Sequence, residues 1–422
     1  MEPYRYRFAS TSAVYTEIEA NIRKDACWSG AANERCFNLL LADRWEVPYS
    51  RLGVDAGCTT GGMRPLVNHI RMTKHITLKA LMVRTMRSYC EAHNCTAAEG
   101  EEEGRGGGDD GCGVRLGDVT PPTFLCVPGA GLGDERGQLM HARDAESELW
   151  ICKPTAGAHG KGIEVVQGYE AALRVVDSAT VEPGYSASRP QRGKCAHRAR
   201  RALRPQPPPA WLVQKYVDRP LLLGGRKFDV RALAALSCSF QVFWYKRWIL
   251  RMCSEAYSPD DLDNRAKHIS NHCVQSSSPD YGKYEAGNEL FPEDMQRYMT
   301  TLYGAQKAVE HIQGVERQMQ RIVWHTTSAV REGAGATNYD AFQLLGYDFM
   351  IDEDMKVWLL EVNGSPACAE SMINKLATDM KEILIDPMFP PRKCSSDHFS
   401  DALVSPRSEN VFVPIDADIV HV

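Results

Sequence analysis

Residues 346–364 read Gly-Tyr-Asp-Phe-Met-Ile-Asp-Glu-Asp-Met-Lys-Val-Trp-Leu-Leu-Glu-Val-Asn-Gly. Both halves alternate apolar and polar side chains with a period of two, as β-strands do, and the polar run 353–356 supplies a turn. Because the turn lacks Asn-Gly, a four-residue loop is favoured over a two-residue loop. The expected hairpin is centred between Asp354 and Met355. It pairs Asp352 with Val357, Met350 with Leu359, and Asp348 with Glu361.

This hairpin predicts a metal site at one end of its ladder. Asp348 and Glu361 lie opposite each other, and Asn363 follows two residues later on the same face. Two carboxylates and an amide oxygen suit a hard cation such as Mg2+, which completes its shell with water and nucleotide phosphates. The alternative is an ordinary acidic hairpin on a wet surface, since exposed acids are common.

Composition places the chain among globular proteins. It has 422 residues, 43% hydrophobic and 24% charged, which is enough for two or three domains. The net charge of −5 gives no general attraction to nucleic acid. No apolar run is long enough to span a bilayer, and the N-terminus lacks a signal-peptide core, so we expect a cytoplasmic location. The 14 cysteines form no Cys-x-x-Cys pair, which indicates reduced thiols and argues against a zinc ribbon or a thioredoxin site.

Composition shifts along the chain predict four segments. Two low-complexity stretches, acidic and Gly-rich near 97–140 and basic and Pro-rich at 186–209, are expected to be disordered insertions. The basic stretch is either a solvated loop or a contact for an acidic partner. We expect a small N-terminal α/β domain at 1–73, a central domain at 74–213, a C-terminal domain with the hairpin at 214–390, and a polar tail at 391–422.

A Gly-rich loop at 154–162 is the first phosphate-binding candidate. It follows a predicted strand, 149–153, that ends in Lys153, and precedes a second strand from Ile163. Glycines let backbone N–H groups face phosphate oxygens, and the lysine adds a positive charge. The loop is not a Walker A motif, because Thr155 and Gly162 stand where Gly and Ser or Thr are needed. A Gly-rich hairpin without a ligand is the alternative.

The strand that begins at Arg226 carries alternating charges. Lys227, Asp229 and Arg231 share one face, whereas Phe228 and Val230 face the core, so the polar face needs a cleft.

Arg231 and Arg251 lie on neighbouring elements, where their planar forks can hold a carboxylate or phosphate, although surface salt bridges are the alternative for each. His268 and His272 have the i, i+4 spacing of zinc enzymes but lack the intervening Glu, so no zinc site is predicted.

In this order the motifs resemble those of the tubulin–tyrosine ligase family, which has an ATP-grasp fold. The resemblance begins at Phe37-Asn38-Leu39-Leu40-Leu41, covers most of the chain, and ends at Glu361-Val362-Asn363-Gly364-Ser365-Pro366-Ala367-Cys368. It therefore implies an α/β (α+β) chain with an ATP-grasp fold and a small N-terminal α/β domain. The stretch between Thr96 and Leu149 has no clear counterpart.

The resemblance implies roles for particular residues. Asp348, Glu361 and Asn363 match the Mg2+ ligands, in agreement with the hairpin argument. Lys74, Lys153 and Lys227 match phosphate contacts, and Gln214, Lys215 and Tyr216 match an adenine hinge. Asp229, Ser270 and Asn271 match further nucleotide contacts, Ser270 replacing Thr. Arg231, Arg251 and Glu361 match the catalytic set, the two arginines engaging carboxylates of the acceptor tail.

The activity implied is ATP- and Mg2+-dependent addition of free tyrosine to the C-terminal glutamate of detyrosinated α-tubulin through an acyl phosphate. The resemblance also allows a K+ ion. The partner is the α-tubulin tail in the αβ-tubulin dimer, and we expect a monomeric, cytoskeleton-associated protein that binds no nucleic acid or membrane.

Two alternatives stay open. The first is a related tubulin polyglutamylase or glycylase; such relatives often carry a cationic extension, whereas this chain stops shortly after Phe389, which favours the tyrosine hypothesis. The second is an inactive tubulin-binding module, against which the intact set of charged residues argues.

Overall fold

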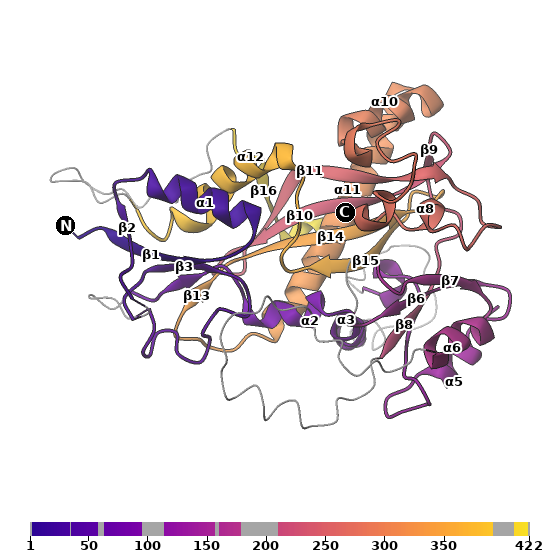
Figure 1. Ribbon diagram of the computed structural model, residues 1–422, viewed down its shortest axis with the longest axis horizontal. Helices are drawn as coiled ribbons and strands as arrows, with labels where there is room; N and C mark the ends of the chain where they lie inside the picture. Colours follow the sequence, from indigo (N-terminus) through magenta and orange to yellow (C-terminus); the bar gives the residue numbers. More distant parts are fainter. Residues whose placement is uncertain are drawn as a thin grey trace, which may run out of the picture.

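The computed structural model describes residues 2–33, 35–57, 63–94, 114–156, 160–178, 210–390 and 409–420. Three β-sheets with helices on their faces make up this part of the chain (Figure 1). None of the helices within these ranges combines the length and apolar character that a membrane span needs.

A parallel sheet in the order β13-β4-β3-β1-β2 forms the N-terminal region. Its strands are β1 (Tyr4–Ala9), β2 (Trp28–Gly30), β3 (Leu39–Ala42), β4 (Leu66–Val67) and β13 (Asp340–Ala341). Residues 37–41, where the family resemblance begins, overlap β3, which is buried throughout. β13 joins this sheet from far along the chain, so the region is not made by residues 1–73 alone.

The largest sheet has the order β12-β11-β10-β14-β15, with β9 and β16 paired at its sides. Its strands are β9 (Leu222–Leu223), β10 (Arg226–Leu236), β11 (Val242–Ala256), β12 (Glu289–Leu290), β14 (Gln343–Ile351), β15 (Val357–Asn363) and β16 (Phe412–Ile415). β16 pairs with β11 and buries Phe412 and Ile415. The predicted polar tail is therefore wrong for residues 409–420, because these two apolar side chains attach the segment to the sheet.

Helices cover both faces of this sheet. The long helix α11 (Ala305–Glu332) packs its apolar stripe on one face, together with α10 (Pro292–Tyr303) and α3 (Lys79–Asn94). The other face packs partly against α1 (Ala13–Arg23) and α12 (Glu370–Met380), which lie side by side in Figure 1. The rest of that second face is charged and stays open.

The third sheet has the order β5-β8-β6-β7. It contains β5 (Thr123–Cys126), β6 (Leu149–Pro154), β7 (Glu164–Gln167) and β8 (Trp211–Lys215), with α6 (Tyr169–Ser178) and α5 (Arg136–Met140) on one face.

Two expectations for this sheet need correction. The predicted domain boundary at 213/214 falls inside β8, which continues to Lys215. The disordered insertion predicted near 97–140 is wrong for residues 114–140, which form α4 (Leu116–Val119), β5 and α5, because Val114, Val119, Leu125 and Leu139 are buried. The acidic stretch 100–111 and the basic stretch 186–209 lie outside the described residues.

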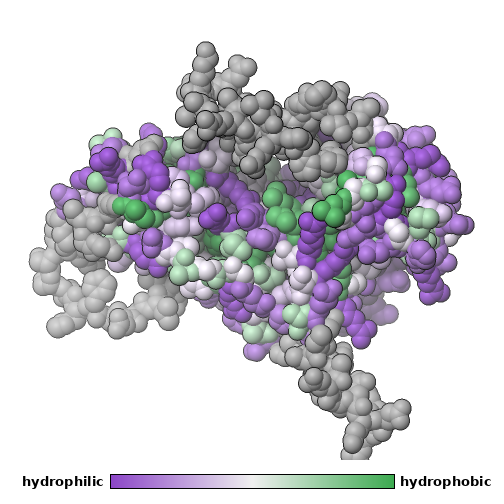
Figure 2. All heavy atoms as spheres, turned by 90° about the horizontal axis from the view of Figure 1, so that it is seen from below, coloured by the Kyte–Doolittle hydropathy of each residue, from purple (hydrophilic) through white to green (hydrophobic). Residues whose placement is uncertain are grey.

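The remaining elements are short. They are η1 (Arg71–Thr73), α2 (Lys74–Thr77), α8 (Arg265–His268), α9 (His272–Gln275), η2 (Ala286–Asn288), η3 (Lys381–Ile385) and η4 (Ala417–Val420). Seen from below, the described surface is mostly hydrophilic, with hydrophobic residues gathered near the middle (Figure 2).

Candidate active site

A row of charged side chains crosses the open face of the largest sheet. In register, Glu289 of β12 lies opposite Arg251 of β11, which lies opposite Asp229 of β10. Two residues on, Arg231 of β10 lies opposite Asp348 of β14. Directly opposed residues of antiparallel strands share a face, so all five side chains project to one side of the sheet. Glu361 of β15, opposite Asp348, continues the row.

The alternation in β10 produces this row. Phe228 and Val230 are buried in the main core, and Lys227, Asp229 and Arg231 point to the other side, as the sequence predicted. The same face becomes apolar further along the strand and packs against α12 and α1. The charged half of β10 is therefore the part that these helices do not cover.

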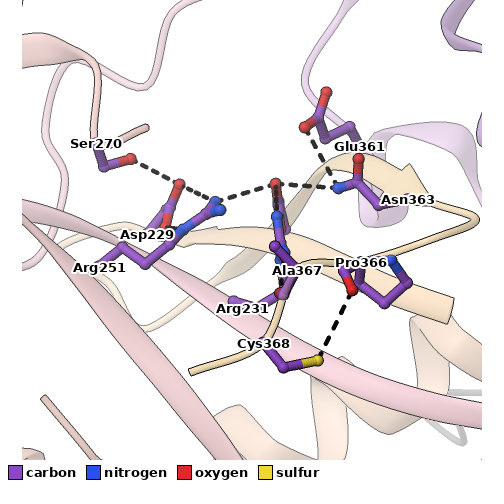
Figure 3. Close-up of polar contacts among 10 residues, drawn as sticks. Asp229, Arg231, Arg251, Ser270, Glu361, Asn363, Pro366, Ala367 and Cys368 are labelled. Carbon is purple, nitrogen blue, oxygen red and sulfur yellow. Dashed lines mark hydrogen bonds and ion pairs between the residues drawn. The ribbon is translucent and has the colours of Figure 1, made fainter. Parts of the chain in front are cut away.

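The two arginines and two aspartates form a continuous chain of ion pairs (Figure 3). Arg251 Nε and Nη2 each lie 2.6 Å from an oxygen of Asp229, and Nη2 lies 3.0 Å from Asp348 Oδ2. Arg231 Nη2 donates to Asp348 Oδ2 at 3.0 Å, and Nη1 donates to the carbonyl oxygen of Ala367. Ser270 Oγ donates to Asp229 at 2.6 Å. Both guanidinium forks thus already hold protein carboxylates.

This pairing determines the charge state of the buried groups. Burial favours the neutral acid at Asp348, but Arg231 and Arg251 outweigh it and hold its pKa well below the usual value. Burial also opposes the charged form of Arg251, yet Asp229 and Asp348 raise its pKa. Asp348 and Arg251 are therefore both held in their charged forms. The contact of Arg231 and Arg251 with an acceptor carboxylate stays a prediction. Each guanidinium group would have to bind that carboxylate in addition to the aspartates that it already holds.

The predicted hairpin forms, but its register differs. Asp348 pairs with Glu361 as expected, whereas Ile351 pairs with Val357, Phe349 with Leu359 and Met350 with Trp358. The predicted pairs of Asp352 with Val357 and Met350 with Leu359 are therefore wrong.

The turn explains the difference. Asp352 Oδ1 accepts hydrogen bonds from the backbone N–H of Asp354 and Lys356, so a five-residue turn, 352–356, replaces the four-residue loop. A bulge at Leu360 then restores the expected pairing of Asp348 with Glu361.

The three predicted metal ligands converge. Asn363 Nδ2 lies 3.3 Å from Asp348 Oδ2 and 3.4 Å from Glu361 Oε1. Glu361 also lies 3.4 Å from Lys79 Nζ. Among the described residues no group of three or more His, Cys, Asp and Glu side chains is placed to hold a metal. Two carboxylates and an amide oxygen fit a Mg2+ ion that takes its other ligands from water and phosphate.

Two buried lysines provide the second feature of the site. Lys153 Nζ donates to Gln214 Oε1 at 2.8 Å, and Lys227 Nζ donates to the Tyr216 hydroxyl at 2.6 Å. Within the described ranges neither lysine has a carboxylate at ion-pair distance. Burial lowers the pKa of each to about 8. A buried ammonium without a counter-charge is costly, so both groups fit an anionic ligand such as a polyphosphate.

The predicted hinge residues line the cleft, but not with free N–H groups. The N–H groups of Lys215 and Tyr216 donate to the carbonyl oxygens of Pro122 and Leu149. Gln214 is buried and donates to Thr120 and Thr123, so it orients Lys153. The three residues support the floor of the cleft, and adenine recognition by them stays a prediction.

The segment at 268–272 contributes Ser270 and Asn271 to the cleft. His268 contacts Tyr216 and the carbonyl oxygen of Asp261, whereas His272 contacts Tyr281. The two histidines have separate partners. The middle of the Gly-rich loop, 157–159, lies outside the described residues.

Not every predicted residue lines the cleft. Lys74, at the start of α2, is absent from the described lining, whereas Lys79, at the start of α3, is part of it. Sequence reasoning missed Lys79 and Glu289. Lys79 begins α3 after a one-residue break from α2, which the helical pattern of the sequence did not show, and Glu289 lies on a two-residue strand.

All the other predicted site residues lie around one cleft of about 940 Å³ between the largest sheet and the third sheet. This volume is in the range of sites for nucleotide-sized ligands. The cleft brings together the ion-pair chain, the three oxygen donors, and the lysines at 79, 153, 215 and 227.

The sheets and this cleft define an α+β protein with an ATP-grasp-like fold. A family model described as the tubulin-tyrosine ligase family matches residues 64–398, well over half of the sequence. The chain therefore belongs to the tubulin-tyrosine ligase family.

Similar curated proteins include protein polyglycylase TTLL10 of Macaca fascicularis, 31% identical over 287 residues, which cover 61% of this chain and 44% of that protein. The protein of the same name from Mus musculus is 34% identical over 242 residues, which cover 56% of this chain and 32% of that protein. Inactive polyglycylase TTLL10 of Homo sapiens is 31% identical over 245 residues, which cover 55% of this chain and 34% of that protein. The matched regions thus span less than half the length of these relatives.

Proposed function

We propose that this chain is an ATP- and Mg2+-dependent ligase that joins the amino group of glycine to a glutamate carboxyl group of tubulin. The observation that carries the ligase proposal is a pair of buried lysines that have no carboxylate partner among the described residues and lie in the same cleft as Asp348, Glu361 and Asn363. This arrangement suits a nucleotide polyphosphate and a divalent cation in one cleft.

The amino acid is chosen from the comparisons. The names of the similar proteins are those of polyglycylases, which favour the glycylase alternative over the tyrosine hypothesis. The family description supports tubulin as the acceptor. Addition of free tyrosine to the α-tubulin tail has no separate support.

The proposed chemistry activates a carboxylate with phosphate. The acceptor carboxylate attacks the γ-phosphate of ATP, and the resulting acyl phosphate is attacked by the amine, which yields an amide, ADP and phosphate. Lys153 and Lys227 hold phosphate oxygens, and Asp348, Glu361 and Asn363 hold Mg2+, which offsets the charge that builds up in phosphoryl transfer. The ion-pair chain fixes the positions of these groups.

A second candidate is an inactive tubulin-binding module. It is favoured by the printed name of the human relative, which is an inactive polyglycylase. Against it stands the complete charged set in the described cleft.

The test is incorporation of labelled glycine, glutamate or tyrosine into αβ-tubulin dimers with ATP and Mg2+, with ADP release measured in parallel. Incorporation of glycine alone supports the proposal. Glutamate or tyrosine incorporation assigns another activity to the same cleft. Tubulin binding without ADP release or incorporation of any amino acid supports the inactive module.

A further inference from the structure

Glu289 is a carboxylate in the charged row that the proposed chemistry does not use. It lies on β12 in register with Arg251, and it lines the cleft. Its neighbour Leu290 packs against the main core on the other face. Since alternate residues of a strand face opposite sides, the Glu289 side chain is directed to the cleft face.

Glu289 differs from the other carboxylates of the row in its partners. Asp229 and Asp348 are held by the arginines, and Glu361 lies beside Lys79. Within the described residues no ion pair or hydrogen bond engages the Glu289 carboxylate. Burial raises the pKa of Glu289 above its usual value and outweighs His272, Arg251 and Arg231, which lower it. It is a half-buried acid whose nearest arginines are already paired.

The charges of the substrates indicate what such a carboxylate can bind. In the proposed reaction ATP and the acceptor carboxylate are anions, which Glu289 would repel. The incoming amino acid is the one substrate that carries a positive group, its α-ammonium. A charge-assisted hydrogen bond between ammonium and carboxylate is stronger than a neutral one.

We propose that Glu289 is a positioning residue that binds the α-ammonium group of the incoming amino acid, and that it marks the amine end of the cleft. This inference rests on the proposed ligase function. Adjacent strands lie about 4.8 Å apart, so the backbones of β12 and β10 are roughly 10 Å apart. Arg251 of β11 lies between these strands, and the side chains of Glu289, Arg251 and Arg231 all line the cleft.

The position of Glu289 suits the second half of the reaction. The ammonium releases a proton to water, the amine nitrogen forms a C–N bond to the acyl carbon, and the C–O bond to phosphate breaks. Phosphate leaves with that electron pair and takes up the second proton, which the nitrogen loses as the amide forms. Glu289 acts by placing the nitrogen next to the acyl carbon and takes no part in forming the acyl phosphate.

The test separates the two half-reactions. Full-length wild-type protein and Glu289→Gln are incubated with αβ-tubulin, ATP and Mg2+. One sample of each receives labelled glycine, and another receives hydroxylamine, an amine that is uncharged near neutral pH and traps acyl phosphates as hydroxamates. Glu293→Gln is the matched control, because Glu293 is an exposed residue of α10 outside the cleft.

We expect Glu289→Gln to raise the KM for glycine about 10- to 100-fold, as loss of a hydrogen bond between charged groups predicts, while the hydroxamate yield stays at the wild-type level. Glu293→Gln should change neither quantity.

An unchanged KM for glycine in Glu289→Gln would overturn the inference. So would an equal loss of hydroxamate and glycine incorporation, because Glu289 would then serve the first half-reaction or the fold. Absence of hydroxamate with the wild-type protein would instead overturn the ligase proposal, and the inference with it.

Discussion

Individual residues of the cleft divide into paired and unpaired charges. Asp229, Asp348, Arg231 and Arg251 neutralise one another, whereas Lys153 and Lys227 have only neutral partners among the described residues. The paired charges hold one another in place, and the two lysines are available for an anionic ligand. This division predicts different consequences when each kind of residue is replaced.

Replacing Glu361 tests the metal site. We expect Glu361→Gln to reduce turnover at least about a hundredfold, since metal stabilisation of developing charge is worth several kcal/mol. The melting temperature should stay unchanged, because 28% of the side chain is exposed. Labelled amino-acid incorporation and thermal unfolding measure the two effects. Glu353→Gln, on the hairpin turn, is the matched control, and wild-type turnover in Glu361→Gln would contradict the metal assignment.

Replacing Arg231 tests the ion-pair chain. Arg231→Met leaves Asp348 buried with one arginine fewer, and loss of a buried partner costs about 3–5 kcal/mol of unfolding free energy. We expect the lower end of this range, because Arg251 stays near Asp348. Urea unfolding measures the change. Arg219→Met, which breaks the exposed pair with Glu353, should cost about 0–1 kcal/mol; equal losses in the two variants would contradict the argument.

The buried lysines predict a proton linkage. Burial lowers the pKa of Lys153 and Lys227 to about 8, so each is partly neutral at pH 8. Bound phosphate favours the charged form and raises both values, so ATP binding should take up protons from about pH 8 upward.

Calorimetry at pH 8 in buffers of different ionisation enthalpy measures this uptake. The proton uptake should be smaller in the double variant Lys153→Arg/Lys227→Arg, because both arginine side chains stay charged with and without ATP. Heats that are independent of the buffer in the wild-type protein would contradict the linkage. Without ligand, the folded-state pKa values lie below the unfolded ones. Below pH 8 the two lysines therefore lower the free energy of unfolding by their full amount. This destabilisation diminishes as the pH rises toward the unfolded pKa.

The elements determine which residues reach the cleft. The bulge at Leu360 in β15 adds one residue, and without it Glu361 would point to the opposite face. Asp348, Glu361 and Asn363 meet only because the five-residue turn and this bulge offset each other. Local irregularity in one strand thus builds the predicted metal site.

A glycine in β14 tests how closely the segment after β15 must pack. A Cβ on Gly346 would lie 2.5 Å from Pro366 Cβ, so Gly346→Ala must push away the segment whose Ala367 carbonyl oxygen accepts from Arg231. We expect a loss of about 1–3 kcal/mol in unfolding free energy and lower activity.

Gly314→Ala is the matched control. Gly314 lies within α11 with no neighbour near its Cβ position, so this change should stabilise by about 0.5–1 kcal/mol. Chemical unfolding compares the two variants. Opposite signs are expected, and a neutral Gly346→Ala would contradict close packing at the cleft.

At the scale of the whole molecule, the cleft joins parts that are distant in sequence. Lys79 comes from α3, Lys153 and Gln214 from the third sheet, and the charged row from the largest sheet. A ligand that contacts all of them links these parts. Its binding should therefore stabilise the fold as a unit.

Thermal unfolding with a non-hydrolysable ATP analogue and Mg2+ measures this linkage. At a ligand concentration of 100 Kd we expect about 2.7 kcal/mol of added stability and a higher melting temperature. Lys153→Met/Lys227→Met should fold but show no shift. A shift of wild-type size in this double variant would mean that the ligand binds elsewhere.

The sequence by itself determined the elements and much of the site. Period-two alternation is local, so it predicted the charged face of β10, the hairpin, and the opposition of Asp348 and Glu361. Motif order predicted the family, which the family model confirms. The preference for tyrosine did not follow from any local pattern, and similar proteins named polyglycylases favour another amino acid.

Only the tertiary structure decided how these elements meet. Strand order placed Glu289 beside Arg251, packing chose Lys79 over Lys74 for the cleft lining, and sheet pairing used the N–H groups of Lys215 and Tyr216. Residues 114–140 and 409–420 became ordered because their few apolar side chains found partners far along the chain. The physical reason is the same throughout: alternation fixes the face of a residue, whereas contacts between distant segments fix its neighbours.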